Sequence, residues 1–401
     1  MLSWEQTPSL QPMRCCRAWV EINHLALHHN LKQIKSLLGG HTDLMAVVKA
    51  DAYGHGAVTV AQVALRAGAT WLGVATVPEG IELREAGIQA QILVMGAVNS
   101  REEMEAIAHW RLQPTLVMPK QALVFSDVLS GFVAARPASV HLKLDTGMSR
   151  LGFPCSEAVE FVQFVRQLPH LRIASLYSHL ATADSPDPTI MEQQQQRFAK
   201  AIRQLRAKQL MPPRLHLANT AASLTDPSLH YDMVRIGLGL YGLYPAPHLR
   251  SRLDLQPVMQ VKARLTHLKD VPAGTGVSYG HQFVADRPMR LGVVGIGYAD
   301  GVPRSLSNRV KVLVNGQLAQ QVGAITMDQL MIDVTHIPGL QEGDVVTLLG
   351  QDGQHQITAD DWAAMTNTIS WEILCGFKHR LPRVAIEQQI WWAKSTIHPT
   401  S

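Results

Sequence analysis

Short apolar runs alternate with longer amphipathic segments from residue 44 to about residue 240 of the chain. Eight of the runs have the length and composition of buried strands, at 44–48, 71–76, 92–95, 113–117, 139–144, 172–178, 214–218 and 233–236. Several are continuously apolar, which is typical of strands buried on both faces of a sheet. Helical patterns lie between most of them, at 57–67, 78–87, 155–167 and 188–210, and a further helix at about 23–38 precedes the first strand. Eight such units in sequence predict a closed (β/α)8 barrel of the TIM type, with an open doubly wound sheet as the alternative.

The pattern changes after residue 250. Strand-like segments are then separated by loops rather than long helices, at 257–270, 291–298, 309–314, 317–325 and 344–349, and a helical segment covers 358–377. Asn315-Gly316 between two of these segments is a strong signal for a two-residue β-hairpin. The sequence therefore predicts three regions: an N-terminal tail at 1–16, the barrel at 17–250, and a smaller, mostly β domain at 251–401.

Composition and charge exclude several classes of protein. The 401 residues are 46% hydrophobic and 17% charged, which is a globular composition rather than that of a disordered chain. The 36 Lys+Arg against 32 Asp+Glu give a net charge of +4 without a basic run, so neither nucleic acid nor an anionic membrane is expected as a partner. The N-terminal residues lack the apolar core of a signal peptide, and the apolar window 121–142 is interrupted by Asp127 and Arg136, so no membrane span is expected. Four cysteines without C-x-x-C spacing and the absence of an H-E-x-x-H motif predict no metal site, and a reducing cytoplasm is the default location.

Polar residues gather at the predicted ends of the barrel strands. In a (β/α)8 barrel the chemistry lies where the strands end and the βα loops begin. The residues at or just after these ends are Lys49, Lys143, Arg150, His179, Asn219, Thr220 and Arg235. A single lysine that closes an apolar run is more often a surface residue than a functional one. Cationic and polar groups at five strand ends, however, predict one pocket suited to phosphate and carboxylate groups.

The loop after the eighth predicted strand runs from Gly237 through Leu238 to Gly242 and formally matches G-x-G-x-x-G. A dinucleotide-binding motif requires a helix directly after the glycines, and Pro245 and Pro247 exclude a regular helix here. We therefore interpret these glycines as positions of close backbone approach, with amides that could face a single phosphate.

Several of these segments resemble the motifs of alanine racemases, in the same order along the chain. The segment 46–56, AVVKADAYGHG, resembles the pyridoxal-phosphate lysine motif of that family. The later segments that resemble family motifs are 143–152, 178–179, 218–222 and 235–237, together with 277–280 and 326–329 in the small domain. The resemblance covers roughly residues 16–390. It implies a cytoplasmic homodimer with shared active sites that uses pyridoxal 5'-phosphate to interconvert L-alanine and D-alanine and supplies D-alanine for peptidoglycan.

The resemblance also implies roles for individual residues. Lys49 would form the Schiff base with the cofactor and then act as one base, while Tyr279 from the partner's small domain would act as the second base on the opposite face. Arg235 would donate to the pyridine nitrogen and, because arginine only donates, leave it unprotonated, which limits side reactions such as transamination. The other implied roles are cofactor binding for Tyr53, His179, Asn219, Thr220, Gly237 and Leu238, substrate binding for Arg150 and Met327, and support for Lys143, His216 and Asp328. Lys143 matches a lysine that is often carbamylated in relatives, where it would position Arg150. An ion pair with Asp232 is the alternative role for Arg235, and an ordinary loop residue the alternative for Tyr279.

Two positions depart from the family pattern. Trp371 stands where most relatives carry a tyrosine that contacts the phosphate, and because an indole only donates and has a different reach, that role is not transferred. Thr220 replaces a more usual serine, and its hydroxyl can serve the same purpose. The alternative functions are a broad-specificity amino-acid racemase of the same fold and a non-catalytic pyridoxal-phosphate-binding protein, which would resemble the barrel alone. A decarboxylase of this fold is disfavoured because it generally carries an acid where this chain has Arg235.

Overall fold

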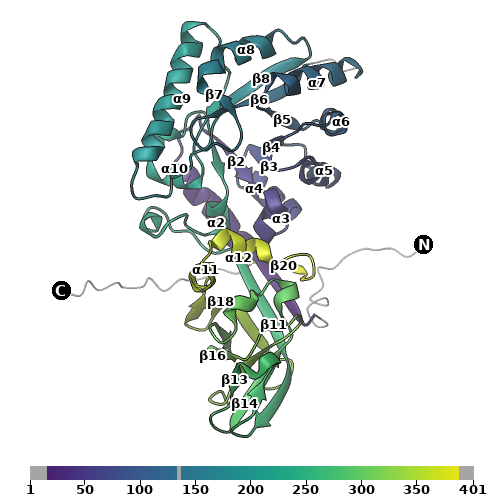
Figure 1. Cartoon of the computed structure of the whole chain (residues 1–401), viewed down its shortest axis with the longest axis vertical. Coiled ribbons are helices and arrows are strands. Elements are labelled where there is room, and N and C mark those ends of the chain that lie inside the picture. The colour runs from purple at the N-terminus through teal and green to yellow at the C-terminus, as the bar shows by residue number, and fades with distance from the viewer. Residues whose placement is uncertain (1–15, 133–136, 388–401) are drawn as a thin grey trace, which may run out of the picture. The chain divides into compact units, whose positions relative to one another are not determined.

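The computed structural model of the chain describes residues 16–132 and 137–387, which form two compact units (Figure 1). One unit comprises residues 24–256, and the other combines residues 16–23 with 257–387. The predicted N-terminal tail lies outside the described residues apart from Cys16.

The first unit is built around eight parallel strands. They are β2 (Asp43–Val47), β3 (Trp71–Val74), β4 (Gln91–Ala97), β5 (Gln113–Leu116), β6 (Ala138–Asp145), β8 (Leu171–Tyr177), β9 (Leu215–His216) and β10 (Met233–Ile236). Their order in the sheet is β10-β2-β3-β4-β5-β6-β8-β9, and the short β7 (Phe153–Pro154) pairs with β6. The two end strands are joined by backbone N–H groups of Asp232 and Arg235, which donate to the carbonyls of Leu215 and Ala218 at 3.0 Å each. The sheet is therefore a nearly closed barrel, as predicted, and not an open doubly wound sheet.

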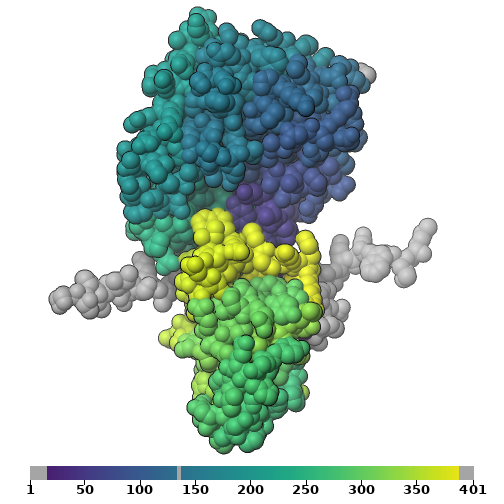
Figure 2. Space-filling view, viewed as in Figure 1, coloured from purple at the N-terminus to yellow at the C-terminus, as the bar shows by residue number. Residues whose placement is uncertain are grey.

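Helices alternate with these strands. They are α2 (His24–Ser36), α3 (Lys49–Gly54), α4 (Ala57–Arg66), α5 (Val77–Glu85), α6 (Arg101–His109), α7 (Pro119–Ser130), α8 (Ala158–Arg166), α9 (Thr189–Ala207) and α10 (Thr220–Thr225). Short 3-10 turns add η1 (Cys155–Glu157), η2 (Pro227–Leu229), η3 (Leu238–Tyr241) and η4 (Pro247–Leu249). Each predicted helix of this region is present, and α5 begins with a capping box between Thr76 and Glu79. Side chains of residues 24–256, coloured purple through teal, form a continuous surface on the face shown in Figure 2.

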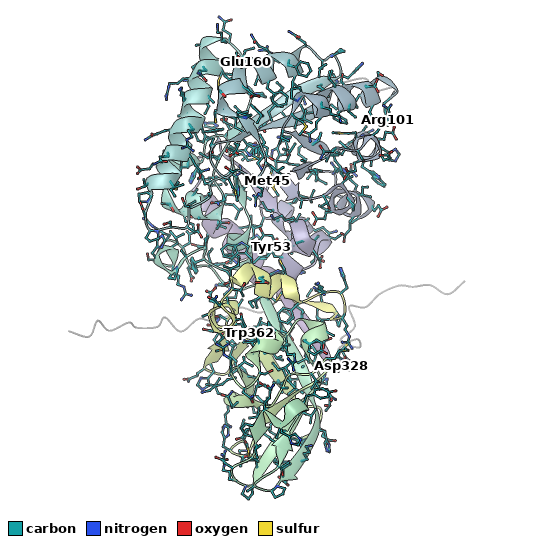
Figure 3. The ribbon with its side chains drawn as sticks, in the orientation of Figure 1. Met45, Tyr53, Arg101, Glu160, Asp328 and Trp362 are labelled. Atoms are coloured by element: carbon teal, nitrogen blue, oxygen red, sulfur yellow. The ribbon has the colours of Figure 1, made fainter. Side chains whose placement is uncertain are left out.

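The barrel interior is packed with side chains rather than hollow. Met45, Trp71, Leu93, Tyr177 and Met233 form one buried cluster from strands of the barrel. Figure 3 shows Met45 among the strands, whereas Arg101 and Glu160 project from the outer helices α6 and α8. Polar side chains are buried in the same interior, among them Gln113, His141, Ser175, His216 and Arg235.

The second unit is mostly β, as predicted. Its main sheet contains β1 (Ala18–Asn23), β11 (Met259–Val271), β14 (Met289–Val294), β15 (Lys311–Val314), β16 (Gln317–Val322), β17 (Leu330–Asp333), β18 (Val345–Asp352), β19 (His355–Ile357) and β20 (Arg383–Ile386). Because β18 pairs with both β15 and β11, the strands β11, β14, β17, β16, β15 and β18 form a closed ring. The remaining elements are β12 (Gly276–Val277), β13 (Phe283–Val284), η5 (Tyr279–His281), η6 (Tyr298–Asp300), η7 (Arg304–Leu306), α11 (Ala359–Thr366) and α12 (Ser370–Gly376).

The predicted hairpin at Asn315-Gly316 is confirmed. β15 and β16 pair antiparallel with Val314 opposite Gln317, which leaves two residues in the turn. Asn315 and Gly316 have φ values of 49° and 72°. Positive φ at both central positions is the conformation of a type I′ turn, for which Asn-Gly is the preferred pair.

The boundary of the two units differs from the prediction. Residues 17–23 were expected in the barrel, but β1 pairs antiparallel with β11 and parallel with β20, so it belongs to the β-rich unit. The second boundary falls between residues 256 and 257 rather than after residue 250. Local pattern could not reveal this, because the partners of β1 lie more than 200 residues further along the chain. None of the helices in the described part of the chain combines the length and the apolar character that crossing a bilayer requires.

Candidate active site

Lys49 follows β2 at the carboxyl end of the barrel, and an unusual turn comes directly after it. Residues 50–53 all have φ between 52° and 54° and ψ between 42° and 50°, a left-handed helical turn without glycine. Such a conformation costs about 1–2 kcal/mol per residue, so surrounding contacts must hold it. The Ala50 N–H donates to Glu79 Oε1, and Asp51 Oδ1 accepts the Ala57 N–H, both at 2.8 Å. The backbone next to Lys49 is therefore fixed by contacts with neighbouring elements.

The left-handed turn ends at Tyr53, whose phenol lies against the loop after β10. Tyr53 is buried, and a Cβ added to Gly237 would lie only 2.6 Å from its Oη. Thr220 Oγ1 accepts the backbone N–H groups of Gly237 at 3.1 Å and Gly239 at 3.4 Å. Because Oγ1 accepts from the backbone, its own proton is free to be donated elsewhere. The hydroxyls of Tyr53 and Thr220 thus lie near Gly237, at a point where a side chain at position 237 does not fit, and this arrangement fits a phosphate group.

Asn219 has a structural role at this point of the fold. Its side chain caps α10 by accepting the Ala222 N–H at 3.0 Å. The cap fixes the start of α10, where Thr220 is the first residue. The contact of Asn219 with the cofactor stays a prediction.

Arg235 is buried near the end of β10 and makes four hydrogen bonds. Nη1 donates to His216 Nδ1 at 2.9 Å, and Nη2 donates to the carbonyls of Ser178 at 2.7 Å and Leu217 at 3.0 Å and to His179 Nδ1 at 3.2 Å. Burial lowers the pKa of the guanidinium to about 10, which still leaves it charged at neutral pH. The alternative pairing with Asp232 is wrong, because Asp232 Oδ2 instead accepts the Leu215 N–H at 2.7 Å. The orienting contact expected from His216 is present.

Two of the cationic side chains, Lys143 and Arg235, lie over the ring of Tyr177. Lys143 Nζ lies 5.4 Å from the centroid of the Tyr177 ring, and the Arg235 guanidinium carbon lies 5.2 Å from it. Burial raises the pKa of Tyr177 to about 12, so the ring is a neutral platform whose face attracts cations. Sequence reasoning missed Tyr177, although its position two residues before His179 in an apolar strand indicates an inward-facing side chain.

Four cationic side chains influence one another at the strand ends. Burial, together with the charges of Arg235, Arg150 and Lys49, lowers the pKa of the Lys143 amine to about 8. The same charges and burial hold the pKa of His179 well below its usual value, so its imidazole is neutral. Lys143, Arg150 and His179 line a common pocket. This pocket is formed by β6, the loop after it and the end of β8, and the charges of Lys49 and Arg235 act on Lys143 within it.

The loop after β6 presents Arg150. Asp145 Oδ1 accepts three successive backbone N–H groups, those of Gly147, Met148 and Ser149, at 2.9–3.1 Å. Gly152 has a φ of 137°, and a Cβ there would lie 2.4 Å from the Asp145 nitrogen. The carboxylate and the close approach at Gly152 shape the loop, and Arg150 remains exposed on it.

The other expected site residues belong to the β-rich unit. Tyr279 begins η5 with 72% of its surface exposed, and Met327 is 53% exposed. The Met327 carbonyl accepts the Ala299 N–H at 3.0 Å. A carboxylate only accepts, so the Met327 N–H is the backbone group of this residue that could bind a substrate carboxylate. Trp371 lies in α12, half-buried.

An ion-pair network supports this surface of the β-rich unit. Asp300, whose carboxylate is buried, accepts two hydrogen bonds from Arg17 at 2.7 and 2.9 Å. Arg380 lies 3.5 Å from the same carboxylate and donates to Asp328 Oδ1 at 2.5 Å. The network ties Asp328, which follows Met327, to the loop of η6, and sequence reasoning did not find Asp300 or Arg17.

Comparisons with known proteins agree on one family. The model of the alanine racemase N-terminal domain matches residues 22–245, and that of the alanine racemase C-terminal domain matches residues 258–385. An alanine racemase of Nostoc is 65% identical over 92% of this chain and 96% of its own length, and one of Synechocystis is 64% identical over 92% and 99%.

Solved structures give the same result. The alanine racemase of Bacillus anthracis with bound L-Ala-P superposes with a TM-score of 0.86 at 34% identity, covering 92% of this chain and 95% of that one. The alanine racemase of Bartonella henselae with covalently bound pyridoxal phosphate superposes with a TM-score of 0.81 at 28% identity, covering 92% and 100%. This chain belongs to the alanine racemase family.

Proposed function

We propose that this chain interconverts L-alanine and D-alanine with two bases, Lys49 and Tyr279, that act on opposite faces of the substrate. The activity itself, that of a pyridoxal-phosphate-dependent alanine racemase, follows from the family and from relatives at 64–65% identity. The residues that carry out the reaction are our assignment. It is supported by the convergence of Lys49, Tyr53, Thr220, Arg235 and Gly237 on one end of the barrel.

The residues present fit pyridoxal phosphate. Lys49 would hold the cofactor covalently, and Tyr53, Thr220 and the Leu238 N–H would hold its phosphate where a Cβ at position 237 is excluded. Gly237 would contribute this space, and its own N–H donates to Thr220 Oγ1. The donor-only guanidinium of Arg235 would face the pyridine nitrogen, with the neutral His179 near the ring. When bound, the cofactor withdraws the electrons that remain at the substrate Cα after its proton leaves.

The protein residues supply binding and proton transfer. Arg150 and the Met327 N–H would hold the substrate carboxylate and so fix the direction of the Cα–H bond. The Lys49 amine would remove or return the proton on one face of Cα, and the Tyr279 phenol would do so on the other. A phenol has an ordinary pKa of about 10, so it needs nearby cations such as Arg150 to act as a base.

We assign the two bases of each site to different subunits of a homodimer. The barrel unit would bind the cofactor, and the β-rich unit would complete the site of the partner. The exposure of Tyr279 and Met327 supports this assignment, because a second copy of the chain can cover them. A β-rich unit that matches a family model over residues 258–385 argues against the barrel-only, non-catalytic protein considered from sequence.

Mixing two inactive variants tests the shared site. Lys49→Ala and Tyr279→Phe should each lose racemisation, but co-refolded in equal amounts they form hybrid dimers in which one of two sites keeps both bases. Random pairing then restores about a quarter of the wild-type activity per dimer. If both bases of a site came from one chain, every hybrid site would lack a base and the mixture would stay inactive.

Exchange in deuterated water tests the two-base assignment separately. Tyr279→Phe should still exchange the α-proton of one alanine enantiomer with solvent while no longer producing the other enantiomer, because one base remains on one face. Racemisation retained in both single variants would contradict the assignment.

The same purified protein, screened with Ala, Ser, Lys and Arg enantiomers, decides between a strict and a broad racemase, since a methylene is worth only about 1–3 kcal/mol of discrimination.

We also propose that the enzyme works in the cytoplasm and supplies D-alanine for peptidoglycan. Restoration of growth of a D-alanine-requiring bacterium by this chain, and loss of that growth with Lys49→Ala, would support this role. Growth that still requires added D-alanine while active enzyme is present in the cells would contradict it.

A further inference from the structure

A line of hydrogen bonds crosses the barrel interior from Arg235 to the opposite strand ends. His216 Nε2 lies 2.8 Å from Ser175 Oγ, Ser175 Oγ lies 2.6 Å from His141 Nδ1, and His141 Nε2 lies 2.8 Å from Gln113 Oε1. Gln113 in turn contacts Gln91, and both begin their strands, β5 and β4. Each link from His216 to Gln113 is buried. None of these residues except His216 had an expected role.

The donors of this line must all point away from Arg235. A guanidinium has no acceptor, so His216 Nδ1 must offer a lone pair to it and its ring proton must lie on Nε2. His216 then donates to Ser175 Oγ, and the Ser175 hydroxyl donates to His141 Nδ1. His141 therefore also carries its proton on Nε2 and donates to Gln113. Because a serine oxygen can accept two hydrogen bonds, the far end is also needed: Gln113 Oε1 only accepts, so it takes the proton on His141 Nε2 and leaves His141 Nδ1 to accept from the Ser175 hydroxyl.

Both imidazoles must be neutral for this pattern, and their surroundings keep them so. Burial and the charge of Arg235 hold the pKa of His216 well below its usual value, and burial lowers the pKa of His141 to about 3. The rings are also held in place by stacking. Tyr177 lies parallel to His216 at 4.6 Å between centroids, and Trp71 meets His141 edge-on at 5.4 Å.

We propose that Ser175, His141 and Gln113 are positioning residues, which fix His216 in the tautomer with a bare Nδ1 and thereby hold the Arg235 guanidinium in its orientation toward the cofactor's pyridine nitrogen. The proposal rests on the proposed contact of Arg235 with the cofactor. In the other tautomer of His216, an N–H would face the Arg235 donor and break that bond. The guanidinium would then turn toward its remaining partners, which are the Ser178 and Leu217 carbonyls and His179 Nδ1.

A matched pair of substitutions at His141 separates positioning from packing. In His141→Asn the side-chain oxygen takes the place of Nδ1 and can still accept the Ser175 hydroxyl, although the side chain is smaller. In His141→Leu the volume is better filled but the acceptor is lost. Positioning predicts that kcat stays within about twofold of wild type in His141→Asn and falls about tenfold in His141→Leu, with KM for alanine unchanged in both. A purely structural role predicts the reverse order, because the larger apolar side chain fills the core better.

Nitrogen NMR tests the tautomers directly and does not depend on activity. In holoenzyme with ¹⁵N-labelled histidine, the signals of His216 and His141 are those lost in His216→Asn and His141→Asn. Both residues should show a protonated Nε2 and a bare Nδ1 in the wild type, and His216 should show mixed tautomers in His141→Leu and in the nearly isosteric Ser175→Ala. A proton on Nδ1 of His216 in the wild type, or an unchanged His216 spectrum in both variants, would overturn the proposal.

The role of Arg235 is tested by a separate variant. If Arg235→Lys leaves the cofactor spectrum and racemisation unchanged, the proposed contact of Arg235 with the pyridine nitrogen is wrong. The tautomer of His216 is still decided separately by the NMR experiment. If the tautomers are as expected but kcat is equal in His141→Asn and His141→Leu, the line exists without a positioning role and the inference is wrong.

Discussion

Lys143 carries the prediction that depends most directly on the electrostatics of the site. Its amine is buried among Arg235, Arg150 and Lys49, which together with burial lower its pKa to about 8. Only a neutral amine adds carbon dioxide to form a carbamate. At pH 8 about half of the Lys143 amines are neutral, against about 0.3% for a lysine with an ordinary pKa. The site therefore raises the concentration of the reactive form by more than about a hundredfold.

We predict that Lys143 is carbamylated when the protein is exposed to bicarbonate near pH 8. The product carries a negative charge in place of a positive one, so it relieves the repulsion among the cations and can accept hydrogen bonds from Arg150. The sign of the pH dependence follows from the lowered pKa: the neutral fraction falls as pH falls through about 8, reaching about one in ten at pH 7. At constant dissolved carbon dioxide, carbamate occupancy should fall in the same direction.

Carbon NMR with ¹³C-labelled bicarbonate measures this occupancy. A carbamate signal should appear in the wild type, be absent in Lys143→Arg, and persist when the exposed Lys120 is replaced by arginine as a control. Lys143→Arg should also raise KM for alanine about tenfold, because a fixed cation cannot orient Arg150. No carbamate at saturating bicarbonate near pH 8, or the same signal in Lys143→Arg, would refute the reasoning.

Three further substitutions have expected outcomes. Gly237→Ala places a methyl group 2.6 Å from Tyr53 Oη and should weaken pyridoxal phosphate binding at least about tenfold in an absorbance titration. Gly40→Ala is the control and should leave binding unchanged, because an added Cβ there meets no neighbouring atom and Gly40, like Gly237, has no positive φ. Asp300→Asn removes the charge that Arg17 and Arg380 share and should lower the free energy of unfolding by about 2–4 kcal/mol in denaturant titration; a loss below about 0.5 kcal/mol would refute this. Asn219→Ala removes the cap of α10 and should cost about 1 kcal/mol in the same assay, and Asn219→Asp, which keeps an acceptor, should cost less.

The barrel was predictable because its strands are buried on both faces. Such strands appear as short apolar runs, and each of the eight expected runs overlaps a strand of the barrel. The Asn315-Gly316 hairpin was predictable for a different reason, since its backbone conformation is set by the two residues themselves. Where structure depends on local composition, sequence was sufficient.

Features that depend on distant partners were not predictable. The left-handed turn at 50–53 contains no glycine, and it is held by Glu79 and by Asp51, which no local propensity indicates. β1 has the composition of any buried strand, and only its pairing with β11 and β20 assigns it to the second unit. The strand β6 was expected as an apolar run, so the importance of His141 within it was not apparent until Ser175 and Gln113 were seen beside it.

The hydrogen-bond partners of Arg235 in the barrel interior are uncharged, and this affects which reaction the site favours. Its hydrogen bonds go to two neutral imidazoles and two carbonyls, so the guanidinium keeps its charge without a carboxylate bonded to it. A carboxylate bonded to the Arg235 guanidinium would weaken the hydrogen bond that the guanidinium donates to any other group. Neutral acceptors leave the guanidinium a strong donor. In the proposed mechanism this donor faces a pyridine nitrogen that it cannot protonate. Electron withdrawal from Cα is then limited, which favours rapid return of the proton to Cα over its delivery to another carbon. Racemisation rather than transamination is therefore the outcome that the interior of this barrel supports.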